Sequence, residues 1–199
     1  GGTSFLLSKG NVFEKVGVNK STVSGTFSNE FRGKILGAKK DGKYWASGIS
    51  VVAHMKNPKI PAIHFNTRFI VTTKEWFGGG MDVTPSYKDI KEKKLVHNML
   101  KKVCVKNKKN YKRYKNWCDK YFYLPHRKEI RGIGGIFFDY ETKDWNKNFK
   151  FVRELGLTFI NISNKLKSLL GFVLPFVAFG IFLFVNWIAG NEMQQFFPY

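Results

Sequence analysis

Acidic residues are scarce in this chain, which has 14 aspartate and glutamate residues against 34 lysine and arginine residues. The formal net charge of +20 favours an acidic partner, such as nucleic acid, anionic lipid or a polyanionic small molecule. The excess is almost entirely lysine, however, and a solvated lysine-rich surface without a binding function explains it as well. The charge therefore narrows the class of ligand without identifying one.

Cysteine is also scarce, and the common catalytic motifs are absent. Cys104 and Cys118 have neither the spacing of metal ligands nor that of a disulfide framework, which predicts reduced, buried thiols. The sequence has no GxxxxGK(S/T) phosphate loop, no G-x-S-x-G nucleophile motif and no zinc ribbon. The RGIGG run at 131–135 is no dinucleotide fingerprint. Motifs for nucleotide binding, acyl transfer and structural zinc are thus missing.

What the chain does contain is a patterned segment at residues 57–85. His64, Asn66 and Arg68 occupy alternate positions, and alternate residues of a β-strand point to the same face. Such a face presents a proton-transfer group, an amide and a fixed cation together. Polar groups in an apolar segment need partners or a ligand, so the segment predicts a functional surface.

Two charged residues of this segment have competing interpretations. The guanidinium of Arg68 has the rigid fork of donors that suits a carboxylate ligand, but an ion pair with Asp82 or Asp139 is the structural alternative. Asp82 follows the Gly78–Gly80 run, where a loop could hold its carboxylate against a ligand. An Asx-turn or a helix cap is the alternative role for Asp82.

The distribution of apolar residues predicts an α+β fold. Hydrophobic content of 43% and aromatic content of 17% are typical of a folded chain. Strand-like and helix-like blocks are separated along the chain and do not alternate regularly, which favours α+β over a doubly wound parallel sheet. The patterns predict short strands and turns in 1–40, strands at 44–54, 62–73 and 131–140, and helices at 88–109, 111–122 and 147–163.

Residues 169–190 form an uncharged apolar run near the end of the chain. Its length and apolarity make it a candidate transmembrane helix, although Pro175, Asn186 and three glycines weaken that interpretation. Residues 101–115 are rich in lysine and tyrosine and suit either phosphate contacts with nucleic acid or a solvated helix surface.

The four histidines leave metal binding open. His54, His64, His97 and His126 show no HxH or HxxxH spacing, and a lone histidine usually has a structural role. His54 and His64 could face each other across adjacent strands. The residues alone do not decide between metal binding and a structural role for these histidines.

Several long motifs resemble one enzyme family, the oxygen-dependent coproporphyrinogen III oxidases of haem synthesis. The matching words run in family order: NVFEKVGVN (11–19), ISVVAH (49–54), NPKIPAIHFNTRF (57–69), WFGGGMDVTP (76–85), WCDKYFYLPHRKEIRGIGGIFFD (117–139) and FVRELG (151–156).

The resemblance implies a fold, a reaction and partners. The fold is a broad antiparallel β-sheet flanked by helices on both faces, in a cytoplasmic homodimer that binds no nucleic acid. The reaction converts two propionate groups of coproporphyrinogen III to vinyl groups, giving protoporphyrinogen IX. Molecular oxygen is the co-substrate, and neither flavin nor haem takes part.

The resemblance also implies roles for individual residues. His64 is expected to donate a proton, Asp82 to engage the pyrrole nitrogens, and Arg68 to serve catalysis as well as binding. The substrate-binding set is Ser50, Asn66, Thr67 and Arg68. His54, His64, His97 and His126 match the histidines assigned to a divalent metal in bacterial members.

The resemblance ends near residue 163. We therefore expect a partial catalytic domain at 1–163, lacking an N-terminal segment of the family, and an atypical hydrophobic tail at 164–199 that contains an extra apolar helix. A frameshift or truncation is one explanation of the tail. The other is a membrane-anchored, non-catalytic tetrapyrrole- or anion-binding protein that uses 169–190 as its anchor. A third hypothesis is a basic nucleic-acid-binding module built on 101–115.

Overall fold

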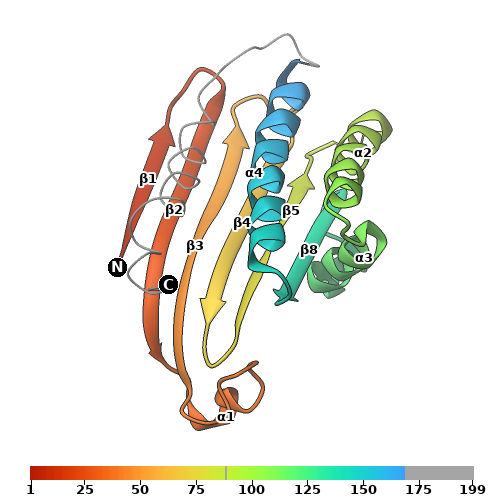
Figure 1. The fold of residues 1–199 in the computed structure, drawn as a ribbon. Coiled ribbons are helices and arrows are strands. Elements are labelled where there is room, and N and C mark those ends of the chain that lie inside the picture. Colours follow the sequence, from red (N-terminus) through yellow and green to blue (C-terminus); the bar gives the residue numbers. More distant parts are fainter. Residues whose placement is uncertain (88, 169–199) are drawn as a thin grey trace.

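The computed structural model describes residues 1–87 and 89–168, and its centre is a six-stranded antiparallel sheet (Figure 1). The strand order is β1–β2–β3–β4–β5–β8, so each of the first five strands pairs with its neighbour in the sequence. These strands are β1 (Gly2–Ser8), β2 (Phe13–Thr26), β3 (Lys43–Met55), β4 (Ala62–Val71), β5 (Glu75–Thr84) and β8 (Gly134–Glu141).

The remaining elements connect and cover the sheet. The short helix α1 (Asn29–Arg32) lies between β2 and β3, and a small hairpin of β6 (Tyr123–Leu124) and β7 (Glu129–Ile130) encloses the 3-10 helix η1 (Pro125–Arg127). The longer helices are α2 (Ile90–Lys106), α3 (Tyr111–Tyr121) and α4 (Trp145–Ser168).

The core lies between the sheet and the helices α2 and α4, and α4 crosses in front of β4 and β5 in Figure 1. Alternate residues of β4 point into it, and the ring of Phe65 lies 5.2 Å from that of Phe159 on α4. Val152, Leu155 and Phe159 recur at helical spacing and are buried against the sheet. The polar side chains of β4, those of His64, Asn66 and Arg68, point to the opposite face of the sheet.

Helix α3 covers the β8 edge of the sheet and contacts both faces. Tyr114 packs on the face that bears α4, with its ring 5.4 Å from Phe138. Tyr121, at the other end of α3, stacks on Phe137 of the opposite face at 4.4 Å. Covering an edge strand in this way removes a site of unwanted strand pairing. It also places aromatic residues of α3 beside the polar face of the sheet.

The predicted α+β class and the broad antiparallel sheet are confirmed. The prediction of short strands in residues 1–40 is wrong for β2, which is 14 residues long, because β3 pairs with it over nearly its whole length. The apolar helix predicted at 169–190 lies outside the described residues. No helix in the part of the chain that the structure describes is long and apolar enough to cross a membrane.

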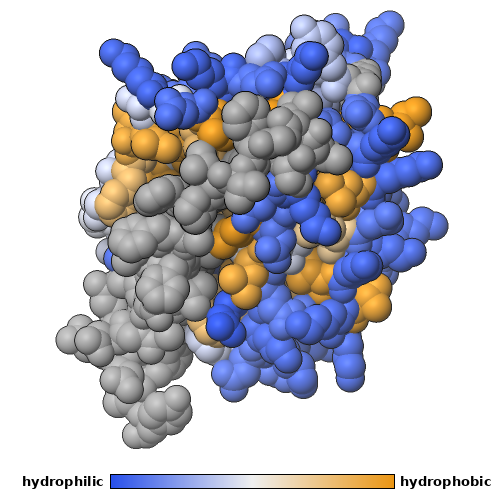
Figure 2. Space-filling model, turned by 90° about the horizontal axis from the view of Figure 1, so that it is seen from above, coloured by the Kyte–Doolittle hydropathy of each residue, from blue (hydrophilic) through white to orange (hydrophobic). Residues whose placement is uncertain are grey.

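The surface reflects the basic composition. Figure 2 shows hydrophilic residues over most of the visible described surface, with hydrophobic residues in separate areas. Exposed large hydrophobic residues include Phe5, Leu6 and Leu7 on the edge strand β1.

Candidate active site

A cavity of about 290 Å³ lies on the sheet face opposite α4. Strand β4 supplies His64, Asn66 and Arg68 to it at alternate positions. Register places Ser50 of β3 beside Asn66 and Asp82 of β5 beside His64. Arg131 and three aromatic residues, Tyr121, Phe122 and Phe137, complete its functional lining. Adjacent strands thus bring together residues that lie far apart in the sequence.

Asp82 is the most buried charged group of this cavity, and Arg131 neutralises it. The Arg131 guanidinium donates through Nε to Oδ2 of Asp82 at 2.8 Å and through a terminal nitrogen to Oδ1 at 2.7 Å. The Asp82 side chain is only 4% exposed. A bidentate fork of this kind fixes both the position and the orientation of the carboxylate.

His64 is the second neighbour of Asp82. Its Nδ1 lies 3.6 Å from Oδ1 of Asp82, beyond a normal hydrogen bond, and Nδ1 has no hydrogen-bond partner. Burial acts to raise the pKa of Asp82, but the contacts and charges of His64 and Arg131 outweigh it and hold that pKa below its usual range. Asp82 is therefore an anion at neutral pH and can accept further hydrogen bonds.

Arg68, four residues after His64 on β4, pairs with a different carboxylate, that of Asp139. One terminal nitrogen donates to Oδ2 of Asp139 at 2.7 Å, and the other donates to Oδ1 of Asn66 at 3.1 Å. Trp76 also donates to Asp139, at 3.0 Å. Of the two ion pairs predicted as alternatives for Arg68, the structure contains the one with Asp139.

The Gly78–Gly80 run makes room for this arrangement. A Cβ on Gly78 would lie 2.4 Å from Oδ1 of Asp139 and 2.9 Å from Nε of Arg68. Glycine at this position therefore permits the Arg68–Asp139 pair to lie flat on the strand. The run lies within strand β5 and not in a loop, and its backbone lies close to neighbouring side chains and strands of the protein itself.

Comparison with known proteins assigns the chain to a family. The family model of coproporphyrinogen III oxidase matches residues 1–167. The chain belongs to this family. The oxygen-dependent coproporphyrinogen-III oxidase of Rickettsia akari (strain Hartford) is 52% identical over 164 residues, which are 81% of this chain and 59% of that protein. Those of Rickettsia africae (strain ESF-5) and Rickettsia bellii (strain OSU 85-389) are 51% identical over the same shares. The chain thus spans about 59% of the length of these relatives.

Thr67 differs from the other substrate-binding residues that the family resemblance predicts. Its neighbours in sequence, Asn66 and Arg68, point into the cavity, so strand alternation turns Thr67 to the face covered by α4. The side chain is 1% exposed, and its hydroxyl has no hydrogen-bond partner. The Thr67 side chain therefore does not line the cavity, and its role in substrate binding stays a prediction.

The four histidines that the family resemblance predicts as metal ligands are not brought together around one point in this structure. The rings of His54 and His64 lie 6.3 Å apart, whereas His126 is exposed on η1. Both ring nitrogens of His97 already face other partners, the Ile133 carbonyl and the Tyr111 hydroxyl. Within residues 1–87 and 89–168, no three His, Cys, Asp or Glu side chains are placed to hold one ion. This ligand set does not fit a metal.

Arg131 was missed by reasoning from the sequence, although it belongs to the family motif at 117–139. No local pattern distinguishes it from the other basic residues nearby. Only the pairing of β5 with β8 brings its turn beside Asp82. The guanidinium also lies 3.7 Å from the centre of the Phe122 ring, which restrains the cation from its other side.

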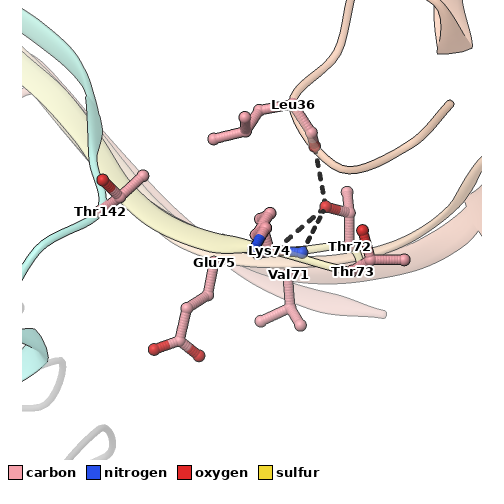
Figure 3. Close-up of a pocket in the computed structure, with 7 residues that line it drawn as sticks. All are labelled: Leu36, Val71, Thr72, Thr73, Lys74, Glu75 and Thr142. Carbon is pink, nitrogen blue, oxygen red and sulfur yellow. Dashed lines mark hydrogen bonds between the residues drawn. The ribbon is translucent and has the colours of Figure 1, made fainter.

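A larger hollow, of about 610 Å³, lies at the β4–β5 hairpin and contains none of the predicted site residues (Figure 3). The Thr72 hydroxyl donates to the Leu36 carbonyl at 2.8 Å, and the Thr73 hydroxyl donates to the Gly37 carbonyl at 2.7 Å. These bonds fasten the hairpin to the segment before β3. The larger of the two hollows is therefore not the one that contains the predicted site residues.

Proposed function

We propose that the complete protein catalyses the oxygen-dependent oxidative decarboxylation of coproporphyrinogen III to protoporphyrinogen IX. For each of two propionates, a CH2–CH2–COO⁻ group, one O2 and one proton become a vinyl group, CO2 and H2O2. The carbon–carboxylate bond breaks, the adjacent carbon loses hydrogen, and oxygen takes the two electrons. The chemistry needs no flavin or haem, because the electron-rich tetrapyrrole can react with oxygen itself.

The observation that carries this proposal is the cavity in which the His64–Asp82–Arg131 cluster and Arg68 lie on one sheet face. The family match supports the proposed reaction, and the side chains that line the cavity support it with a proton carrier, an anion and cations on one face. Catalysis of this reaction requires the substrate to be positioned, a proton to be moved and charge on a pyrrole to be stabilised. Each requirement has a side chain on this face.

Arg68 is the proposed anchor for a substrate carboxylate. A guanidinium has five N–H donors, and the bonds to Asp139 and Asn66 use only part of them. The Arg68 side chain is 28% exposed, so the remaining donors can be reached from the cavity. Asn66 and Ser50 lie side by side across the β3–β4 pair and offer neutral hydrogen bonds next to it.

Asp82 is the proposed acceptor for pyrrole N–H groups, and His64 is the proposed proton donor. The lowered pKa keeps Asp82 ionised, so it serves as an acceptor and stabilises positive charge that develops on a pyrrole ring. His64 has an unbonded Nδ1 directed toward the same carboxylate. The two residues therefore face one reaction centre from adjacent strands.

Oxygen uptake with coproporphyrinogen III under controlled aeration tests the proposal. We expect Arg68→Ala and Asp82→Asn to lower kcat/KM by at least tenfold, because each removes a charged contact to the substrate. Arg153→Ala is the matched control, since Arg153 is an exposed residue of α4 on the opposite side of the sheet. Equal rates in all three variants would refute the site, and uptake that yields no CO2 would refute the reaction.

We also propose that the protein forms a homodimer in the cytoplasm, as the family resemblance implies. The exposed Phe5, Leu6 and Leu7 on edge strand β1 support a protein contact at this edge. Analytical ultracentrifugation should show a dimer that Leu6→Lys dissociates. A monomer at all concentrations would contradict the dimer, and recovery of the protein only with membranes would contradict the location.

A further inference from the structure

His97 lies outside the cavity lining but contacts the turn that carries Arg131. Its Nε2 is 2.8 Å from the carbonyl oxygen of Ile133, and its Nδ1 is 2.8 Å from the Tyr111 hydroxyl. A carbonyl oxygen can only accept, so Nε2 carries a proton and donates to Ile133. In the neutral ring Nδ1 then accepts from the hydroxyl of Tyr111, and neither nitrogen has a lone pair left for a metal.

The turn that His97 contacts is held tightly at both ends. The Gly134 amide donates to the Arg131 carbonyl at 3.1 Å, which closes a four-residue turn. The Ile133 amide donates to the Val83 carbonyl of β5 at 3.0 Å. Gly132 has a φ of +58°, and a Cβ there would lie 2.3 Å from the Val83 carbonyl oxygen. Ile133 is thus fixed by β5 through its amide and by α2 through its carbonyl.

We propose that His97 is a positioning residue, which holds this turn so that the Arg131 guanidinium stays forked on Asp82, and that it is no metal ligand. The inference rests on the proposed function, in which the Asp82–Arg131 pair forms part of the active site. Val83, which anchors the turn, directly follows Asp82 in β5. A shift of the turn relative to β5 therefore changes the distance between the two partners of the fork.

The two roles make different demands on the side chain at position 97. A positioning role requires one hydrogen-bond donor near Nε2, which glutamine can supply and leucine cannot. A metal-ligand role requires a free imidazole nitrogen, which neither glutamine nor leucine replaces. His97→Gln and His97→Leu are therefore a matched pair of similar size. His54→Ala serves as a control, because His54 is exposed on β3 and belongs to the same predicted metal set.

Amide hydrogen exchange of the whole chain, measured by NMR, tests the positioning role without any need for activity. In His97→Leu we expect the Ile133 and Gly134 amides to exchange at least tenfold faster, while amides at the β1–β2 pair keep their wild-type rates. His97→Gln should restore near-wild-type exchange, and His54→Ala should have no effect. Equal exchange in the leucine variant and the wild type would overturn the proposal. So would a gain of protection on adding diamagnetic Zn²⁺ to the wild type that both His97 variants lose.

A second measurement tests whether His97 acts through Arg131. The dissociation constant for coproporphyrin III, the unreactive oxidised tetracarboxylate, is compared in His97→Leu, Arg131→Ala and the double variant. We expect His97→Leu to weaken binding about fivefold alone and not at all in the Arg131→Ala background. Multiplicative losses would overturn the proposal. If the wild type binds no porphyrin, the proposed function fails, whereas the exchange experiment still decides the role of His97.

Discussion

Replacing Arg131 with alanine tests the physical basis of the active site most sharply. The substitution leaves the Asp82 carboxylate, with a side chain 4% exposed, without its two charge-assisted hydrogen bonds. Removing one partner of a buried ion pair costs roughly 3–5 kcal/mol. The Arg131 side chain is 30% exposed, so solvent screens part of the pair, and we expect a loss of about 3 kcal/mol at pH 7.

The loss of unfolding free energy in Arg131→Ala should become smaller as the pH falls. In the wild type the pKa of Asp82 is below its ordinary value of 3.8, so the pair stabilises the fold above that value and loses its effect as the pH falls further. In Arg131→Ala this pKa should rise, because burial of the carboxylate is then opposed only by the contact and charge of His64. A protonated carboxyl needs no cation, so the deficit should shrink as the pH falls through the raised pKa.

Urea unfolding followed by tryptophan fluorescence measures both effects. With a slope of about 2 kcal/mol/M, a loss of 3 kcal/mol lowers the midpoint by about 1.5 M at pH 7. We expect a smaller difference at pH 4.5 and partial recovery when Asp82→Asn is added to Arg131→Ala. Arg153→Ala is the control and should leave the midpoint unchanged. A loss below about 1 kcal/mol, or an equal loss at both pH values, would refute the reasoning.

Three further outcomes follow from the structure. Gly78→Ala should displace the Arg68–Asp139 pair and weaken coproporphyrin III binding at least fivefold, because the Cβ of the new alanine would overlap Asp139. Unchanged binding in a titration would contradict this. Thr67→Val should leave the free energy of unfolding unchanged or raise it by up to about 1 kcal/mol, because it removes a buried hydroxyl that has no hydrogen-bond partner. A clear loss of stability in urea unfolding would argue against this. Burial raises the pKa of the Cys104 and Cys118 thiols to about 12, so the folded chain should react slowly with a disulfide reagent at pH 8. Rapid labelling without denaturant would show that the thiols are not buried.

Local patterns predict much of the fold because the first five strands of the sheet pair in the order in which they follow one another along the chain. Alternation predicts β4 and its polar face, and helical spacing predicts α4, which runs on to Ser168. The length of β2 is not predictable from its own residues, since its serine- and threonine-rich sequence is typical of turns. Pairing with β3 along the sheet overrides that local preference.

The sequence likewise predicts only part of the candidate site. His64, Asn66 and Arg68 share a face because of strand periodicity alone, so the sequence predicts them. The partner of Asp82 is set by the long-range pairing of β5 with β8, and periodicity carries no information about it. Family resemblance named His97 as a metal ligand, whereas the position of its ring between Ile133 and Tyr111 gives it two other partners.

The central claim is that the cavity on the sheet face opposite α4 binds the substrate. Anaerobic binding of coproporphyrinogen III to this chain tests it most directly. Titration without oxygen separates binding from reaction. We expect one saturable site whose dissociation constant rises at least tenfold in Arg68→Ala, since a hydrogen bond to a charged group contributes about 1.5–3 kcal/mol. Arg153→Ala should leave that constant unchanged. Equal binding by both variants and the wild type would contradict the account.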